Sequence, residues 1–256
     1  MGLEAVDTVK NLISTHNIDC DLKHGDMHLA HKRRLCAGMK EEIDFLADRY
    51  NFHDLEYIPE ERLHEAVGSD GFYGAVWDKT SCHLHPLNYA LGLADAAIKA
   101  GVTIYEHSRV TSYGGSPLVI STTTGQVTAS EIILACNGYI MPINNFVLAT
   151  EPLTDDMARS IIPKDTSMAD SRFVINYWKL SGDNRLIFGG GENYRRKFPR
   201  DIKGFVGKYM RQIYPQLADT KIDYGWGGTL AITMNRLPHF GRVQDNIGHL
   251  QGYSGH

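Results

Sequence analysis

The sequence lacks several features that would place it in a special class of protein. Its 256 residues contain only four cysteines, which are widely spaced and form no C-x-x-C pair, so neither a disulfide framework nor a cysteine zinc site is predicted. Sparse, unpaired cysteines are typical of a reducing compartment, and we expect a cytoplasmic protein. No run approaches the roughly 20 apolar residues of a membrane helix, and the start does not resemble a secretory signal.

A strong charge of either sign is also absent. The 26 Lys and Arg residues stand against 30 Asp and Glu, which gives a formal net charge of −4. This balance gives no electrostatic case for nucleic acid or an anionic membrane as the partner. With 43% hydrophobic residues the chain can bury a sizeable core, and its composition excludes disorder, collagen and coiled coil as the main architecture.

Hydrophobic spacing predicts the elements of the first hundred residues. Apolar residues at spacings of three and four indicate a helix from Leu3 to Ile13, before an extended segment over 20–30 and a second helix over 32–49. A strand is expected over 71–78. Pro86 then begins a helix that Gly101 ends, and we expect His85 to help set up its first turn. The remaining expected elements are a short buried strand over 102–105, a three-stranded meander over 109–113, 118–123 and 127–136, strands over 147–153, 173–180, 186–189, 222–233 and 247–251, and one helix over 202–213.

Together these elements predict an α+β fold. We expect a large, mostly antiparallel sheet with covering helices, joined to an incomplete α/β domain.

Two local motifs have competing interpretations. Gly189-Gly190-Gly191 follows a strand, as a phosphate cradle would, but Tyr194 stands where the dinucleotide fingerprint needs its last glycine, so a glycine-rich turn is favoured. The pair His83 and His85 could hold a metal in a hydrolase. No carboxylate stands at the spacing that would complete such a site, and we predict no metal.

An ordered set of segments carries a family resemblance. The set resembles the FAD-dependent amine and amino-acid oxidoreductases of the D-amino-acid oxidase and glycine oxidase superfamily, and within it the gamma-glutamylputrescine oxidoreductase type. Its members are Gly71–Asp78, His85–Leu93, Ser108–Val110, Ala135–Tyr139, Ala149–Leu153, Trp226–Thr229, Arg236–Gly241 and Gly252–His256.

The resemblance also shows what the sequence does not contain. Family members open with a βαβ unit carrying G-x-G-x-x-G, whose backbone N–H groups hold the FAD pyrophosphate, and this motif is absent here. Members also continue past the Gly255-His256 loop. We therefore expect a fragment that is inactive alone and binds FAD weakly or not at all.

By the same resemblance, the chain divides into parts of two domains. Residues 1–19 form a helix bordering the FAD domain, residues 20–75 and 141–235 form the substrate domain, and residues 76–140 and 236–256 form a partial FAD-binding domain. The residues that the resemblance implies contact FAD are Val110, Ala135, Cys136, Asn137, Gly138, Gly241, Gly252, Tyr253, Ser254, Gly255 and His256.

The resemblance implies oxidation of a C–N bond of a small-molecule amine by hydride transfer to flavin, as in putrescine catabolism. Trp226, Tyr177 and Trp178 are the expected substrate contacts, although at least one of them should be plain core. Gly228-Thr229-Leu230 stands where many amino-acid oxidases place a carboxylate-binding Arg, which speaks against a small α-amino acid as substrate. No catalytic residue is named.

A second hypothesis is a non-catalytic binding module derived from a flavoprotein substrate domain. Either way, strands without their parallel neighbours should expose a sheet edge. The sequence thus predicts dimerisation through that edge, aggregation, or local disorder around Ser108–Gly138.

Overall fold

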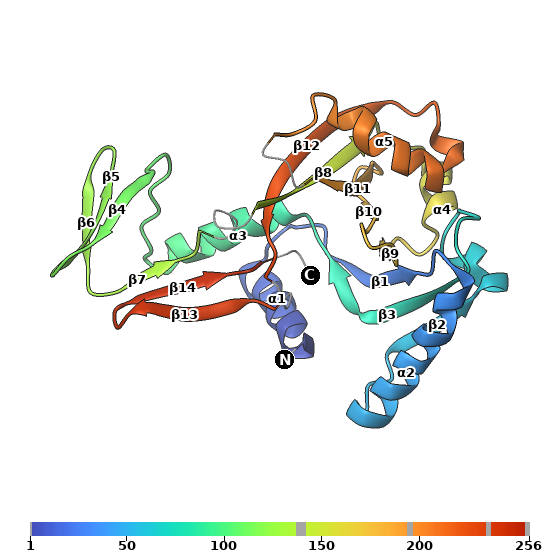
Figure 1. Ribbon diagram of the computed structural model, residues 1–256, viewed down its shortest axis with the longest axis horizontal. Helices are drawn as coiled ribbons and strands as arrows, with labels where there is room; N and C mark the ends of the chain where they lie inside the picture. Colours follow the sequence, from blue (N-terminus) through green and yellow to red (C-terminus); the bar gives the residue numbers. More distant parts are fainter. Residues whose placement is uncertain (1, 137–141, 194–196, 234–236, 254–256) are drawn as a thin grey trace. The chain divides into compact units, whose positions relative to one another are not determined.

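The structure is a computed structural model that describes residues 2–136, 142–193, 197–233 and 237–253. The chain forms two compact units (Figure 1). Unit 1 comprises Met1–Ala97, Asn145–Glu192 and Lys197–Gly227, and unit 2 comprises Ile98–Asn144, Asn193–Arg196 and Gly228–His256. The assignment of residues to substrate and FAD domains stays a prediction.

The core of unit 1 is built on one eight-stranded sheet, in which the described pairings are antiparallel except between β1 and β9. The α+β fold with a large, mostly antiparallel sheet is therefore confirmed. The strand order is β12 (Ile222–Ala231), β8 (Pro142–Thr150), β11 (Leu186–Asn193), β10 (Tyr177–Leu180), β9 (Ser167–Asp170), β1 (Lys23–Leu29), β3 (Gly74–His83) and β2 (Leu55–Pro59).

Two helices bury one face of this sheet. Helix α5 (Ile202–Ile213) contributes Val206, Met210 and Ile213 to the core, as its apolar spacing predicts. Helix α4 (Asp155–Ile161), which the sequence analysis did not predict, adds Ala158 and Ile161. Its first turn is capped by the Thr154 hydroxyl, which accepts a hydrogen bond from Met157 N.

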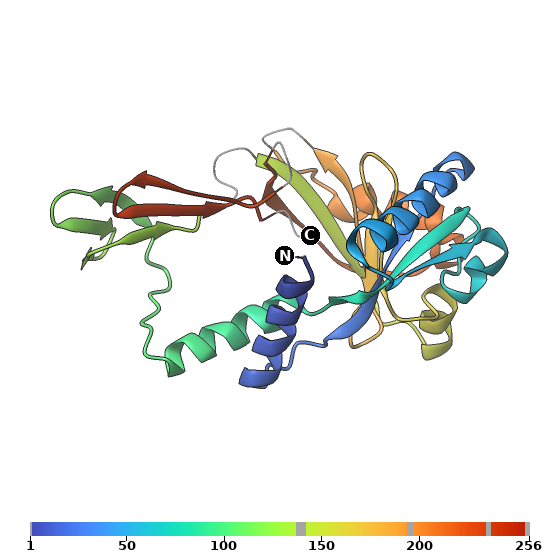
Figure 2. The ribbon, with the colours of Figure 1, turned by 90° about the horizontal axis from the view of Figure 1, so that it is seen from below.

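Helix α2 (Cys36–Tyr50) packs against β2 and β3 (Figures 1 and 2). The edge strand β2 carries the Tyr57 ring. The Lys40 Nζ atom lies 4.5 Å from the centre of that ring. Two short 3-10 helices adjoin it, η1 (Arg33–Leu35) before α2 and η2 (Glu60–Glu65) after β2. A third, η4 (Pro215–Leu217), follows α5.

The remaining helices of this unit are α1 (Gly2–His16) and α3 (Pro86–Lys99). Ile18, just after the end of α1, packs closely against α3, because a Cβ at Gly92 would strike the Ile18 side chain. The predicted role of His85 is confirmed, because its Nδ1 atom accepts a hydrogen bond from Asn88 N at 3.2 Å. Gly101 follows the helix with φ of +93°, as expected for a C-terminal stop.

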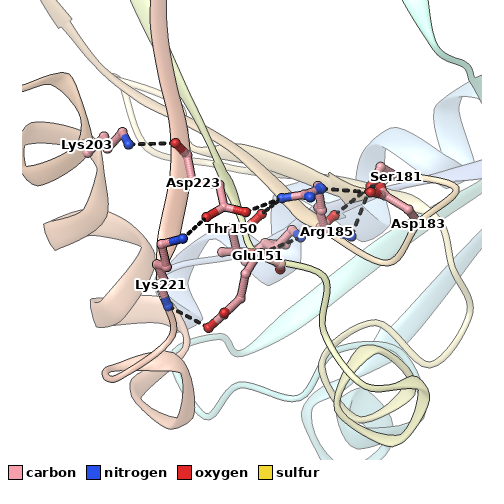
Figure 3. Close-up of polar contacts among 9 residues, drawn as sticks. Thr150, Glu151, Ser181, Asp183, Arg185, Lys203, Lys221 and Asp223 are labelled. Carbon is pink, nitrogen blue, oxygen red and sulfur yellow. Dashed lines mark hydrogen bonds and ion pairs between the residues drawn. The ribbon is translucent and has the colours of Figure 1, made fainter.

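Arg185 fastens one end of the sheet. Its guanidinium donates hydrogen bonds to Asp183, Asp223 and the carbonyl oxygen of Thr150, each at 2.7–2.8 Å (Figure 3). Lys221 adds an ion pair to Asp223 at 2.8 Å. Because these groups come from β8, β12 and the turn before β11, the network joins three segments that are distant in sequence.

Unit 2 contains two three-stranded sheets around a small core of Leu118, Ile132 and Ile247. The first is an antiparallel meander of β4 (Val110–Gly114), β5 (Leu118–Thr122) and β6 (Gln126–Ala129). The second has the order β13 (His239–Gln244), β14 (Ile247–Gln251) and β7 (Ile132–Leu134), with β7 parallel to β14.

Several expected elements need correction. The meander is confirmed, but its third predicted segment divides into β6 and β7, which belong to different sheets. Residues 102–105 were expected to form a buried strand, yet they form none, and Val102 and Tyr105 are 52% and 68% exposed. An apolar segment becomes a strand only where another strand pairs with it, and within the described residues none does. Strands β2, β9 and β13 were not predicted, and of the strand expected over 173–180 only Tyr177–Leu180 forms.

Candidate functional site

The face of the unit 1 sheet opposite the core carries a row of aligned side chains. His28 on β1 lies opposite Ala169 on β9, and Ala169 lies opposite Tyr177 on β10. Tyr177 in turn lies opposite Gly189 on β11. Residues directly opposite one another share a face, so this row crosses four strands on one side of the sheet.

Burial of the neighbouring residues identifies that side. Met27, Met168, Trp178 and Phe188 each lie next to a member of the row and are at most 1% exposed, within the core. Successive strand residues point to opposite faces, so the row faces away from the core. We call this side, with His28, Ala169, Tyr177 and Gly189, the open face.

Tyr177 reaches along the open face to a second polar residue. Its hydroxyl donates a hydrogen bond to Oδ1 of Asn145 on β8. Strand β11 lies between β10 and β8, and the ring crosses it where Gly189 has no side chain. A Cβ at Gly189 would collide with the Tyr177 ring. The glycine therefore permits the contact.

This geometry corrects the interpretation of the glycine run and adds residues that the sequence analysis missed. Gly189 lies within β11 and not in a glycine-rich turn. Asn145 is 8% exposed, and the sequence analysis assigned no role to it or to His28. Along β1, buried positions alternate with partly exposed ones, and this pattern could have placed His28 on the face away from the core. Asn144, Asn145 and Phe146 on β8 are all buried, so no alternation marks Asn145.

The three residues that were expected to contact the substrate do not lie on one face of the sheet. Trp226 on β12 is 45% exposed, and the next residue, Gly227, points into the core, where a Cβ would lie 2.7 Å from Phe146 Cδ1. Trp226 therefore faces the same side as Tyr177. Trp178 is 1% exposed, and its Nε1 donates to the Tyr214 hydroxyl at 2.8 Å, which makes Trp178 the core member of the three.

The expected FAD contacts lie in unit 2. Strands β7 and β14 are parallel, with Ile132 opposite Ile247 and Leu134 opposite His249, so both end at the same edge. Ala135 and Cys136 follow the first, and Gly252 and Tyr253 follow the second. The carboxyl ends of parallel strands are where ligands bind in α/β sheets.

The other expected FAD contacts differ in their surroundings. Val110 on β4 is 51% exposed, and Ala135 and Cys136 are also exposed. A Cβ at Gly241 would strike the His249 ring, so β13 and β14 themselves require that glycine. Asn137, Gly138, Ser254, Gly255 and His256 lie outside the described residues.

These residues fit one part of FAD and not another. Gly252 has φ of +88°, and a Cβ there would lie 2.7 Å from Thr233 Cγ2 and 3.3 Å from the carbonyl oxygen of Leu237. Small residues at adjoining strand ends suit a flat ring or a ribose. The sequence has no G-x-G-x-x-G turn, so the pyrophosphate lacks its usual cradle in this chain.

Among the described residues, no group of three or more His, Cys, Asp or Glu side chains could hold a metal ion. His83 is buried, its Nε2 atom lies 3.1 Å from the carbonyl oxygen of Asp165, and burial lowers the pKa of its imidazole. No described helix is both long and apolar enough to span a bilayer.

Comparisons with known proteins agree with this architecture. The family model for FAD dependent oxidoreductases (DAO) matches residues 1–256. Gamma-glutamylputrescine oxidoreductase from Escherichia coli is 37% identical over 269 residues, and the probable oxidoreductase OrdL from Haemophilus influenzae is 34% identical over 273. All of this chain is aligned in both cases, and it spans 63% and 62% of the two relatives.

Solved structures show the same fold. L-proline dehydrogenase from P. horikoshii superimposes with a TM-score of 0.82 at 19% identity, over 99% of this chain and 72% of that one. Glycine oxidase from Geobacillus kaustophilus gives 0.79 at 17% identity, over 97% and 70%. From the family match along the whole chain, together with these relatives, we conclude that the chain belongs to the FAD dependent oxidoreductase family.

Proposed function

We propose that this chain is the substrate-binding part of an FAD-dependent oxidoreductase that oxidises a C–N bond of an amine related to gamma-glutamylputrescine. The family match and the 37% identical relative support the reaction class. The observation that carries the proposal is the pairing of Tyr177 with Asn145 on the open face. This hydrogen bond fixes a polar group on the face of the sheet that points away from the core.

The chain's own residues would bind and orient the amine. The Tyr177 hydroxyl, held in place by the hydrogen bond that it donates to Asn145, is proposed to contact the amine. Trp226 offers a flat, half-exposed ring against which the carbon chain can pack and exclude water. Tyr177 and Trp226 are thus proposed as substrate contacts, with Asn145 as the residue that positions Tyr177.

Bound FAD supplies a two-electron acceptor for the hydride that leaves the carbon of the C–N bond. We propose that Ala135, Cys136, Gly252 and Tyr253 contact it, as does Val110, together with the expected residues outside the described ranges. Because the chain has no G-x-G-x-x-G turn, we further propose that it binds FAD weakly and does not turn over an amine alone.

The test is binding of gamma-glutamylputrescine to this chain, measured by calorimetry in parallel with a titration of FAD. The variant Tyr177→Phe should bind the amine about tenfold more weakly, because one hydrogen bond is worth about 1.4 kcal/mol here. Gly189→Ala should have a similar effect, since its new methyl group displaces the Tyr177 ring. Tyr209→Phe, on helix α5, is the matched control and should bind as the wild type does.

Two results would contradict the proposal. One is the absence of amine binding by the wild-type chain at millimolar concentration. The other is equal binding by the wild type and Tyr177→Phe. Tight FAD binding by this chain would contradict only the statement about the missing phosphate cradle.

A second candidate function is a non-catalytic module that pairs through an exposed sheet edge. Within the described residues β7 pairs only with β14, and Ile133 on β7 is 65% exposed. Phe240 on β13 is 66% exposed. Dimers held by this edge, together with no amine binding, would favour the module over the oxidoreductase.

A further inference from the structure

Several polar side chains of the open face are bonded within the chain, but His28 is not. Asp26, two residues before His28 on β1, accepts a hydrogen bond from Ser167 Oγ at 2.5 Å. Lys179, two residues after Tyr177 on β10, donates through Nζ to a backbone carbonyl oxygen at 2.5 Å. The partly exposed His28 side chain forms no hydrogen bond or ion pair within the described residues.

The surroundings of His28 leave its ring nitrogens to a ligand. In the register of the sheet its neighbours are Val76 on β3 and Ala169 on β9, whose side chains cannot form hydrogen bonds. A neutral imidazole offers one donor and one acceptor, whichever tautomer is present. His28 can therefore contact a polar group of a molecule that lies on the open face.

An apolar surface separates His28 from the Tyr177 hydroxyl. Ala169 lies between the two residues in the row and contributes only a methyl group. The Tyr177 ring extends away from Ala169, because it crosses β11 above Gly189 and reaches Asn145 on β8. The row thus presents a methyl group and aromatic carbons, on which a chain of methylene groups can pack.

Strand spacing gives the separation of the two polar groups. Strand β9 lies between β1 and β10, so His28 and Tyr177 are two strand spacings apart, or about 10 Å. The Tyr177 ring extends further in the same direction, toward β8. The Tyr177 hydroxyl and the His28 ring are therefore on the order of 10–15 Å apart.

We propose that His28 contacts a polar group at the far end of the amine substrate, so that this chain selects long amines that carry such a group. The inference rests on the proposed function, since it takes Tyr177 as the contact of the amino group. In extended gamma-glutamylputrescine, the amino group lies about nine bonds, or about 11 Å, from the carbon that carries the charged groups of the glutamyl end. That length matches the row.

Selectivity then follows from the number of contacts. A short amine bound at Tyr177 leaves the His28 ring in water, whereas a long amine with a polar end reaches both residues. One hydrogen bond changes a dissociation constant by about tenfold. The contact with His28 should therefore favour the long amine by about that factor.

The experiment measures binding of three probes to this chain by calorimetry: gamma-glutamylputrescine, N-acetylputrescine and n-butylamine. The wild type should bind gamma-glutamylputrescine about tenfold more tightly than n-butylamine. N-acetylputrescine should bind as n-butylamine does, because its amide oxygen is only about 8 Å from the amino group. His28→Leu should remove the preference for gamma-glutamylputrescine and leave n-butylamine binding unchanged.

Two further variants test whether the imidazole itself is responsible. His28→Gln keeps one donor and one acceptor and should retain most of the preference. His24→Leu removes an exposed imidazole from the same strand, about 13 Å away, and should bind all three probes as the wild type does. Urea midpoints equal to that of the wild type show that each variant is folded.

The outcomes separate this inference from the proposed function. Equal affinity of the wild type and His28→Leu for gamma-glutamylputrescine, while Tyr177→Phe weakens it, would overturn the role of His28 and leave the amine function standing. Weaker n-butylamine binding by a folded His28→Leu would also overturn it, because His28 would then act at the amino group. Absence of binding of all three probes by the wild type would refute both proposals.

Discussion

Removal of one buried hydroxyl group should destabilise unit 1 without leaving a cavity. Tyr214 is 0% exposed, and its hydroxyl accepts from Trp178 Nε1 at 2.8 Å and donates to the carbonyl oxygen of Ile161 at 3.2 Å. In Tyr214→Phe the ring still fills its space against Trp178. The Ile161 carbonyl keeps a second donor, Gly68 N, at 3.0 Å.

The cost therefore comes mainly from the indole N–H of Trp178, which is left buried without an acceptor. Such a group costs about 1–3 kcal/mol, and the lost O–H···O bond adds about 1 kcal/mol. We expect Tyr214→Phe to lower the free energy of unfolding by about 2–4 kcal/mol. The same burial raises the pKa of Tyr214 far above its ordinary value, so the residue stays protonated in the folded chain.

Urea denaturation followed by circular dichroism measures the effect, with an unchanged m-value as the sign that only stability has altered. Tyr209→Phe is the control, because the Tyr209 ring is partly buried and the described structure shows no hydrogen bond from its hydroxyl. It should change stability by less than about 0.5 kcal/mol. A loss for Tyr214→Phe as small as that of the control would refute the account of the buried indole.

Three further predictions concern backbone, charge and association. Gly25→Ala should destabilise the chain by about 1–3 kcal/mol more than Gly101→Ala. Both glycines have positive φ, but only at Gly25 would a Cβ meet other atoms at 2.7–2.9 Å. Equal urea midpoints for the two variants would contradict this prediction. Arg185 and Lys221 lower the pKa of Asp223, so their stabilisation is present above about pH 4 and is lost as pH falls further. Arg185→Met should flatten that acid dependence, and an unaltered pH profile would argue against it. Ile133→Lys should reduce self-association in sedimentation experiments, because Ile133 is exposed on the edge strand β7. A wild-type chain that is monomeric at all concentrations would contradict this prediction.

Much of the fold was determined by the sequence alone. The helices near 3–13, 86–99 and 202–213 follow from apolar residues at helical spacing and from local stops such as Gly101 and Tyr214-Pro215. His85 beside Pro86 could be assigned its capping role because that contact joins residues three apart. The family could likewise be inferred from the order of short segments, since order does not depend on how they pack.

The tertiary structure decided which residues lie on the open face of the sheet and which lie in the core. Tyr177 and Trp178 are adjacent aromatic residues in one strand, and only the position of the sheet between core and open face makes one a candidate contact and the other core. Residues 102–105 show the reverse case, in which a strand-like composition gives no strand. Asn145, Gly189 and Tyr177 lie on three strands whose order cannot be deduced from local spacing. Contacts between distant strands depend on register and on neighbours, and these are properties of the folded chain.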